Sequence, residues 1–137
     1  MRISEELLDQ VRAEAAAVAP KECCGLLLSR EAGEIDAIEP YPGPLFENRF
    51  KLSDEWLLRQ HYRCKSAGTK VVGYYHSHPS TSPKPSKRDF REHPPGSFGL
   101  IVGKNGAVEL FFVGDKAEQE NSLNVDQMEG TGIVSFS

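Results

Sequence analysis

The feature that most constrains how this chain can fold is a pair of histidines, His76 and His78, at the end of a strand-forming run. Residues 70–75 (Lys-Val-Val-Gly-Tyr-Tyr) are mostly β-branched or aromatic, which is typical of a β-strand. Side chains at positions i and i+2 of a strand project from the same face. We therefore expect the two imidazoles to point together at the strand end and Ser77 to point away.

A hydroxyl and a carboxylate follow the histidines at helical spacing. Ser86 and Asp89 stand at i and i+3 after a proline-rich loop at residues 79–85, so they would share one face of a short helix. That helix would bring Asp89 back toward His76 and His78. Two neutral imidazoles and one carboxylate predict a transition-metal pocket, with zinc as the first candidate and a fourth position open to water. Zinc lowers the pKa of such a water to about 7, so the pattern indicates hydrolysis.

A hydrolytic centre also needs a group that moves protons, and a carboxylate is the usual choice. Glu22 is a candidate because it directly precedes an apolar run at residues 23–28, where its side chain would lie at the mouth of a buried strand. The chain has 20 acidic residues, and spacing alone does not choose among them. The pair of Ser86 and Asp89 is also an ordinary helix start, in which the serine caps the helix and the acid lies in its first turn.

Together these residues resemble the complete motif of the JAMM (MPN+) zinc metalloprotease family, over about residues 3–113. The resemblance implies an α+β fold of the MPN type, with a mostly antiparallel or mixed sheet flanked by helices and the zinc site at a strand end and the following short helix. We expect residues 1–137 to form a single domain, with 114–137 as a C-terminal extension. The matching elements are Glu22, Cys-Gly-Leu-Leu at 24–27, His-Ser-His-Pro at 76–79, Ser86 and Asp89.

The resemblance also implies a role for each motif residue. His76, His78 and Asp89 would bind one zinc ion per chain, with water as the fourth ligand. Glu22 would deprotonate that water and then protonate the leaving nitrogen, and the Ser86 hydroxyl would stabilise the oxyanion. The implied reaction is hydrolysis of a peptide or isopeptide bond, often after the C-terminal glycine of a ubiquitin-like protein. The chain is more similar to small prokaryotic members, some of which trim ubiquitin-like sulfur-carrier proteins at the C-terminus.

Two other functions stay open on the sequence alone. The first is a non-catalytic scaffold of the same fold, although such relatives typically lack members of the metal set, and this chain has all of them. The second is a cupin-like metal-binding protein built on a His-x-His strand. The glutamate expected a few residues after that pair is absent, because Ser82 and Pro83 occupy the positions.

Composition narrows the class of protein further. At 137 residues, with 39% hydrophobic and 26% charged residues, the chain is typical of one globular domain. Three cysteines in no framework spacing indicate free thiols in a reducing compartment. We find no apolar leader and no run of membrane-spanning length, so we expect a cytoplasmic protein.

The net charge of −4 argues against a nucleic-acid partner, and the basic residues beside the motif would form a solvated face: Lys84, Lys87, Arg88 and Arg91.

Helix and strand signals divide the rest of the chain. We expect His61 and His93 on the surface, with His93 alternatively complementing a helix dipole, and one of Tyr74 and Tyr75 in the core. Helices are predicted from Ser4 to Pro20, from Ser53 to Gly68 and from Ser86 to Pro94. The predicted strands are 23–29 and 34–39 as a hairpin, a short strand at 50–52, the histidine strand, and 98–102 and 107–113 as a second hairpin, with 133–136 as an edge strand or a tail.

Overall fold

The computed structural model describes residues 1–114 and 133–135. Among these residues, no helix has both the length and the apolar character that crossing a bilayer requires. The helices are α1 (Glu5–Val18), α2 (Asp54–Ala67) and α3 (Lys87–Glu92), with a 3-10 turn η1 (Lys104–Gly106). The strands are β1 (Arg2–Ser4), β2 (Cys24–Ser29), β3 (Glu34–Ile35), β4 (Ala37–Pro40), β5 (Lys70–Ser77), β6 (Phe98–Val102), β7 (Val108–Phe112) and β8 (Ile133–Ser135).

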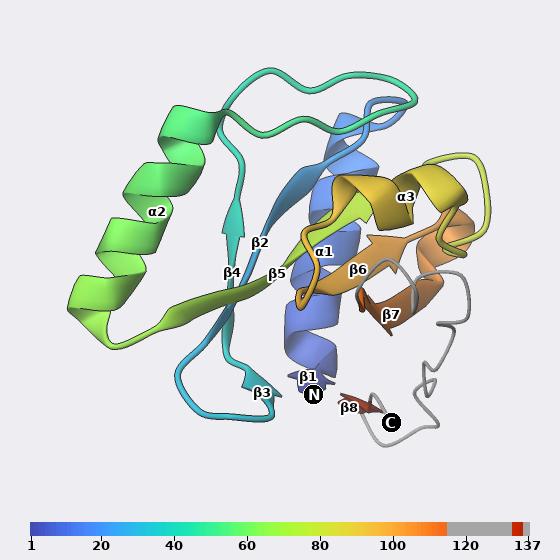
Figure 1. The fold of residues 1–137 in the computed structure, drawn as a ribbon. Coiled ribbons are helices and arrows are strands. Elements are labelled where there is room, and N and C mark those ends of the chain that lie inside the picture. Colours follow the sequence, from blue (N-terminus) through green and yellow to red (C-terminus); the bar gives the residue numbers. More distant parts are fainter. Residues whose placement is uncertain (115–132, 136–137) are drawn as a thin grey trace.

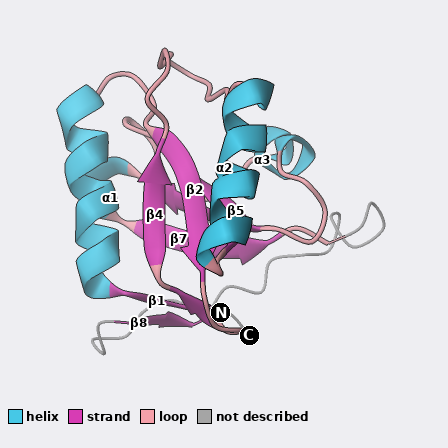
Figure 2. Cartoon of the chain, turned by 90° about the vertical axis from the view of Figure 1, so that its left-hand side faces the viewer, coloured by secondary structure: helices cyan, strands magenta, loops and turns pink. Residues whose placement is uncertain are grey.

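A central sheet of five strands has the order β4-β2-β5-β6-β7 (Figure 1). β5 and β6 are parallel, and the other neighbouring pairs are antiparallel. A parallel pair needs a crossover connection, and α3 lies within it. α1 covers one face of the sheet, whereas α2 and α3 lie on the other face (Figure 2). The predicted mixed sheet flanked by helices is therefore confirmed.

The two long helices begin where the sequence predicts. The Ser4 hydroxyl accepts a hydrogen bond from the Leu7 N–H at 3.2 Å and so caps α1. Ser53 caps α2 in the same way through the N–H of Trp56, also at 3.2 Å. Gly68 ends α2 in the left-handed conformation, with φ of 73°, which favours glycine because it has no Cβ.

Both predicted hairpins form, with local differences. β2 pairs with β4 and β6 pairs with β7, each antiparallel. The predicted strand at 34–39 is divided at Asp36, whose carboxylate accepts the N–H of Arg30, so β3 pairs with β1 instead. Residues 50–52 do not form the predicted short strand. β8 pairs antiparallel with β1, which confirms the edge-strand alternative over Ile133–Ser135, while Phe136 lies outside the described residues.

The two faces of the central sheet bury different clusters. On the α1 face, a large apolar cluster forms the core, and Tyr75 is fully buried in it, whereas Tyr74 is half-buried. On the other face, Phe90 of α3 packs edge-on against Phe111 of β7, with ring centroids 5.3 Å apart. Burying one such side chain contributes on the order of 2 kcal/mol. This contact therefore fixes α3 over the end of the sheet where β5 terminates.

Candidate active site

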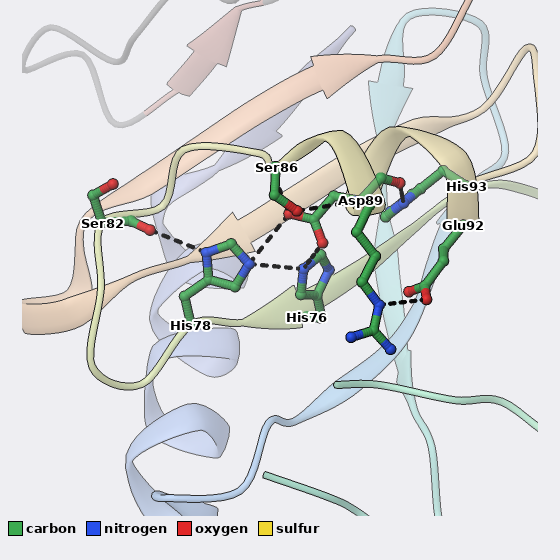
Figure 3. A network of polar contacts seen from close by, with 8 residues as sticks. His76, His78, Ser82, Ser86, Asp89, Glu92 and His93 are labelled. Atoms are coloured by element: carbon green, nitrogen blue, oxygen red, sulfur yellow. Dashed lines mark hydrogen bonds and ion pairs between the residues drawn. The ribbon is translucent and has the colours of Figure 1, made fainter. Parts of the chain in front are cut away.

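The end of β5 places both histidines on the α3 face of the sheet (Figure 3). His76 is completely buried, and His78, one residue beyond the strand, is half-buried. Ser77 points the other way, because its hydroxyl accepts the Cys23 N–H at 2.9 Å. The predicted alternation along this strand is confirmed. Cys24 lies opposite His76 in the sheet register, so β2 closes the pocket on one side.

The start of α3 holds Asp89 in place through a reciprocal capping box. The Ser86 hydroxyl accepts the Asp89 N–H at 3.1 Å, and Oδ2 of Asp89 accepts the Ser86 N–H at 2.8 Å. This arrangement fixes the carboxylate with both oxygens turned toward the histidines. The sequence suggested both a helix that begins at Ser86 and the return of Asp89 to the strand end. The same capping box accounts for both features. The hydroxyl accepts through a lone pair, so its own hydrogen can donate to another group.

The two ring nitrogens and the two carboxylate oxygens that these residues offer lie at nearly equal separations. Nε2 of His76 is 3.2 Å from Nε2 of His78 and 3.1 Å from Oδ1 of Asp89, and Nε2 of His78 is 3.3 Å from Oδ2 of Asp89. Nitrogen and oxygen ligands that lie about 2.0–2.1 Å from a tetrahedral zinc ion are about 3.3 Å from one another. Among the described residues this is the one group of histidine, cysteine and acidic side chains that could hold a metal ion. Its spacing fits zinc.

Hydrogen-bond chemistry also favours a cation between these atoms. The Ser82 carbonyl oxygen, an acceptor, lies 3.0 Å from Nδ1 of His78, so that nitrogen carries the proton. When the ring is neutral, as a histidine that binds a metal must be, Nε2 of His78 is a bare acceptor that faces the Asp89 carboxylate, which is also an acceptor. A cation satisfies two facing acceptors. Orienting a ligating histidine through its second nitrogen is the usual arrangement in metal sites.

The pKa shifts of the three candidate ligands also bear on whether a cation would bind between them. Burial raises the pKa of Asp89, but its contacts with His76 and His78 outweigh burial and hold the pKa well below its usual range. Burial lowers the pKa of His76, which keeps that ring neutral. Burial also lowers the pKa of His78, but the adjacent Asp89 carboxylate raises it above its ordinary value overall. The carboxylate is therefore ionised and attracts positive charge to this point.

Glu22 lies buried at the start of β2, close to the same cluster. Its backbone N–H donates to the Phe46 carbonyl at 2.8 Å, which fixes the entry to the strand. Burial raises the pKa of Glu22 to about 7, opposed by the charge of His78 and reinforced by that of Asp89. A carboxyl group with this pKa exchanges a proton readily at neutral pH. The structure thus brings together all five residues that the sequence selected.

Two aromatic residues that the sequence did not select complete the pocket. Phe50, from the loop between β4 and α2, stacks on the His76 ring with centroids 4.3 Å apart. His93, which follows α3, is only 2% exposed, so its predicted surface position is wrong. Its helix-end alternative is correct in geometry, because Nδ1 lies 2.7 Å from the Asp89 carbonyl oxygen. Position i+4 from Asp89 is a signal that could have indicated this contact. The other histidine expected at the surface, His61, is exposed.

A groove of about 400 Å³ opens beside the cluster. Phe50, Leu52 and Tyr74 give it an apolar lining, and Arg88 and Glu92 of α3 stand at its edge, joined by a 2.8 Å ion pair. Phe50 lines the groove and also stacks on His76, so it connects the groove to the candidate metal-binding cluster.

Comparison with known proteins identifies the family. The model for prokaryotic homologs of the JAB domain matches residues 4–115. A desampylase from Haloferax volcanii is 35% identical over 109 residues, which cover 76% of this chain and 78% of that protein. The chain belongs to the prokaryotic JAB-domain family, so the resemblance inferred from the motif is confirmed and the cupin-like alternative is excluded.

Solved structures agree on the fold. A protein from Desulfitobacterium hafniense has a TM-score of 0.69 at 23% identity and covers 82% of this chain and 84% of its own. A JAB1/MPN domain protein from Archaeoglobus fulgidus has a TM-score of 0.54 at 24% identity and covers 82% of this chain and 89% of its own. The α+β architecture with a mixed sheet is therefore that of the MPN class.

Proposed function

We propose that this chain is a zinc-dependent hydrolase that cleaves an isopeptide or peptide bond at the C-terminus of a ubiquitin-like protein. The observation that carries the proposal is the convergence of His76, His78 and Asp89 at tetrahedral spacing, with the buried carboxyl of Glu22 close by. Burying polar groups costs stability unless they are paired, and a cation would pair the acceptors of this set, which favours a metal-binding role over a metal-free scaffold.

The three clustered residues would hold zinc through Nε2 of each histidine and the Asp89 carboxylate. When bound, zinc supplies Lewis-acid chemistry, which polarises a carbonyl group and makes water acidic enough to react at neutral pH. The protein contributes the orientation of these ligands. The Ser82 carbonyl fixes the ring of His78, and the capping box with Ser86 fixes Asp89.

Glu22 is suited to move the proton in this reaction. With a pKa of about 7, its carboxylate accepts a proton from water as the water oxygen bonds to the substrate carbonyl carbon. The same carboxyl group then delivers that proton to the leaving nitrogen as the carbon–nitrogen bond breaks. One residue therefore acts first as base and then as acid, and the products are a carboxylate and an amine.

Ser86 is suited to stabilise the oxyanion. Its hydroxyl oxygen already accepts the N–H of Asp89, one of the candidate metal ligands, and this bond holds the oxygen next to that residue. The hydroxyl hydrogen can then point toward negative charge that develops on the substrate carbonyl oxygen. A preorganised donor of this kind typically contributes about 10²–10³ in rate.

The substrate class rests on the relative and on the groove. The similar protein from Haloferax volcanii is named as a desampylase, which favours an isopeptide bond to a ubiquitin-like protein over an ordinary peptide bond. The groove beside the cluster, lined by Phe50, Leu52 and Tyr74, supplies an apolar channel for an extended C-terminal segment of such a substrate.

The test uses one ubiquitin-like protein in two forms, joined through its C-terminus to a lysine side chain or carrying a linear C-terminal extension. The zinc-loaded chain should cleave the first form and release the ubiquitin-like protein with a free C-terminal carboxylate. The mass of the product identifies this cleavage. Chelation should abolish release, and one equivalent of zinc should restore it. Cleavage that survives chelation would overturn the zinc requirement, and no product from either form would overturn the proposed reaction.

A further inference from the structure

Two buried nitrogen atoms on neighbouring rings have no hydrogen-bond partner within the described part of the chain. They are Nδ1 of His76 and Nε2 of His93. The two ring centroids are 5.7 Å apart, and the rings come from the end of β5 and the residue that follows α3 (Figure 3). Unpaired polar atoms in a buried site are rare, so a pair of them on adjacent rings calls for a physical reason.

The protonation of His93 is set by its other nitrogen. Nδ1 of His93 lies 2.7 Å from the Asp89 carbonyl oxygen, which can only accept, so Nδ1 carries the hydrogen. The ring is only 2% exposed and is packed among aromatic side chains, surroundings that favour the neutral form of an imidazole. Nε2 of His93 is therefore a bare acceptor. The surrounding rings of Phe50, Tyr74 and Phe111 shield it from bulk water.

The protonation of His76 follows from the metal-binding direction. Nε2 of His76 is the atom that faces Asp89 and His78. A neutral imidazole that offers its Nε2 lone pair to a cation carries its hydrogen on Nδ1. Nδ1 of His76 is then a donor without an acceptor, and the centroid of its ring lies 5.7 Å from that of His93, which carries the bare acceptor. The two unpaired atoms are chemically complementary.

We propose that His93 is a positioning residue: its Nε2 accepts a hydrogen bond from Nδ1–H of His76 and holds that ring with Nε2 toward the metal. A direct hydrogen bond and a single bridging water would each satisfy both atoms. Because Nδ1 of His93 also donates to the Asp89 carbonyl, one ring connects two of the three metal ligands. This inference rests on the metal site of the proposed function and is independent of the substrate.

Two substitutions separate this role from packing. His93→Phe keeps the ring volume but removes both hydrogen-bonding nitrogens, whereas His93→Gln restores an acceptor near the position of Nε2. Losing a hydrogen-bond partner of a ligating histidine typically lowers metal affinity by about 10–100-fold. We expect that loss in His93→Phe and a recovery to within about threefold of the wild type in His93→Gln, measured by competition with a chromophoric chelator.

Nitrogen-15 NMR of the zinc-loaded protein supplies the second readout. The wild type should show a slowly exchanging Nδ1–H on His76, and His93→Phe should lose it. Phe50→Leu is the matched control, because it loosens packing on His76 and His93 but removes no hydrogen-bonding atom, so it should keep the signal.

Unchanged zinc affinity together with a protected His76 Nδ1–H in His93→Phe would overturn the role of His93. A wild type that binds zinc but cleaves neither substrate form would reject the proposed reaction instead, and the comparison of the His93 variants would still be decisive.

Discussion

Tyr75 and His76 are neighbours on β5, yet their side chains leave the sheet on opposite faces and meet different surroundings. Tyr75 enters the apolar core under α1, where its hydroxyl donates to Glu14 at 2.7 Å. His76 enters a polar cluster under α3, with Asp89 and a second imidazole at hydrogen-bond distance. Both residues are fully buried. One face of the sheet therefore holds the main apolar core, and the other face combines a smaller apolar cluster with the polar candidate site.

This difference teaches that burial alone does not reveal the role of a residue. An apolar side chain gains free energy when it leaves water, whereas a buried carboxylate or imidazole loses hydration that only a partner restores. On the α1 face the partners are mainly other apolar groups, and the Tyr75 hydroxyl is paired with Glu14. On the α3 face the ligand atoms face one another, and zinc is the partner that fits them. Substitutions on the two faces should therefore change different measured quantities.

The largest expected effect is on turnover, from Glu22→Gln. The amide keeps the shape of the side chain but cannot accept the proton, so turnover of the isopeptide substrate should fall by about 10²–10⁴-fold while zinc content stays unchanged. Glu55→Gln is the control, because Glu55 lies exposed on α2. A Glu22→Gln protein that cleaves as fast as the control would show that another group is the base.

The second effect is on stability, from Leu8→Ala on the α1 face. Leu8 is fully buried, and such a truncation should lower the free energy of unfolding by about 2–5 kcal/mol in denaturant titrations. Zinc affinity of the folded protein should not change. Leu58→Ala, at an exposed position of α2, should alter stability by no more than about 0.5 kcal/mol. Weaker zinc binding in Leu8→Ala would mean that the two faces are coupled.

The third prediction separates two roles of Ser86, in capping α3 and in stabilising the oxyanion, by measuring stability and turnover. Ser86→Ala should lower turnover by about 10²-fold, since the oxyanion donor is lost. It should also cost about 1 kcal/mol of stability, since α3 loses its cap. Ser53→Ala removes the equivalent cap of α2 and should show the stability loss with full turnover. If both variants retain turnover, Ser86 acts only as a cap.

The smallest effect is a pH dependence of stability in the metal-free protein. Burial raises the pKa of Glu22 from 4.5 to about 7, so the folded chain binds this proton more tightly than the unfolded chain. The resulting stability is complete below about pH 4.5 and is lost as the pH rises through about 7. Glu22→Gln should lack this loss. If the free energy of unfolding changes with pH in the same way for the two proteins, folding does not raise the pKa of Glu22.

The sequence predicted those parts of the structure that depend on local signals. Ser4 and Ser53 mark helix starts because capping involves residues only three positions apart. His76 and His78 share a face because the pleat of a strand fixes it. The return of Asp89 to the histidines required a tertiary assumption about α3, and the family motif supplied it.

The sequence did not predict contacts made across the fold. Phe50 belongs to a loop where the sequence predicts a short strand, and only the folded chain brings its ring onto His76. His93 precedes two prolines, which suggested a solvent-exposed helix end. Its burial depends on packing between α3 and the aromatic residues Tyr74 and Phe111, which no local pattern contains.

The most direct test of the metal site is the zinc content of the purified chain, measured by native mass spectrometry after exposure to one equivalent of zinc. We expect one ion in the wild type, none in His78→Ala, and one in His61→Ala, which removes an exposed histidine far from the cluster in sequence. A wild type without zinc, or a His78→Ala protein that keeps it, would contradict a metal site built from the end of β5 and the start of α3.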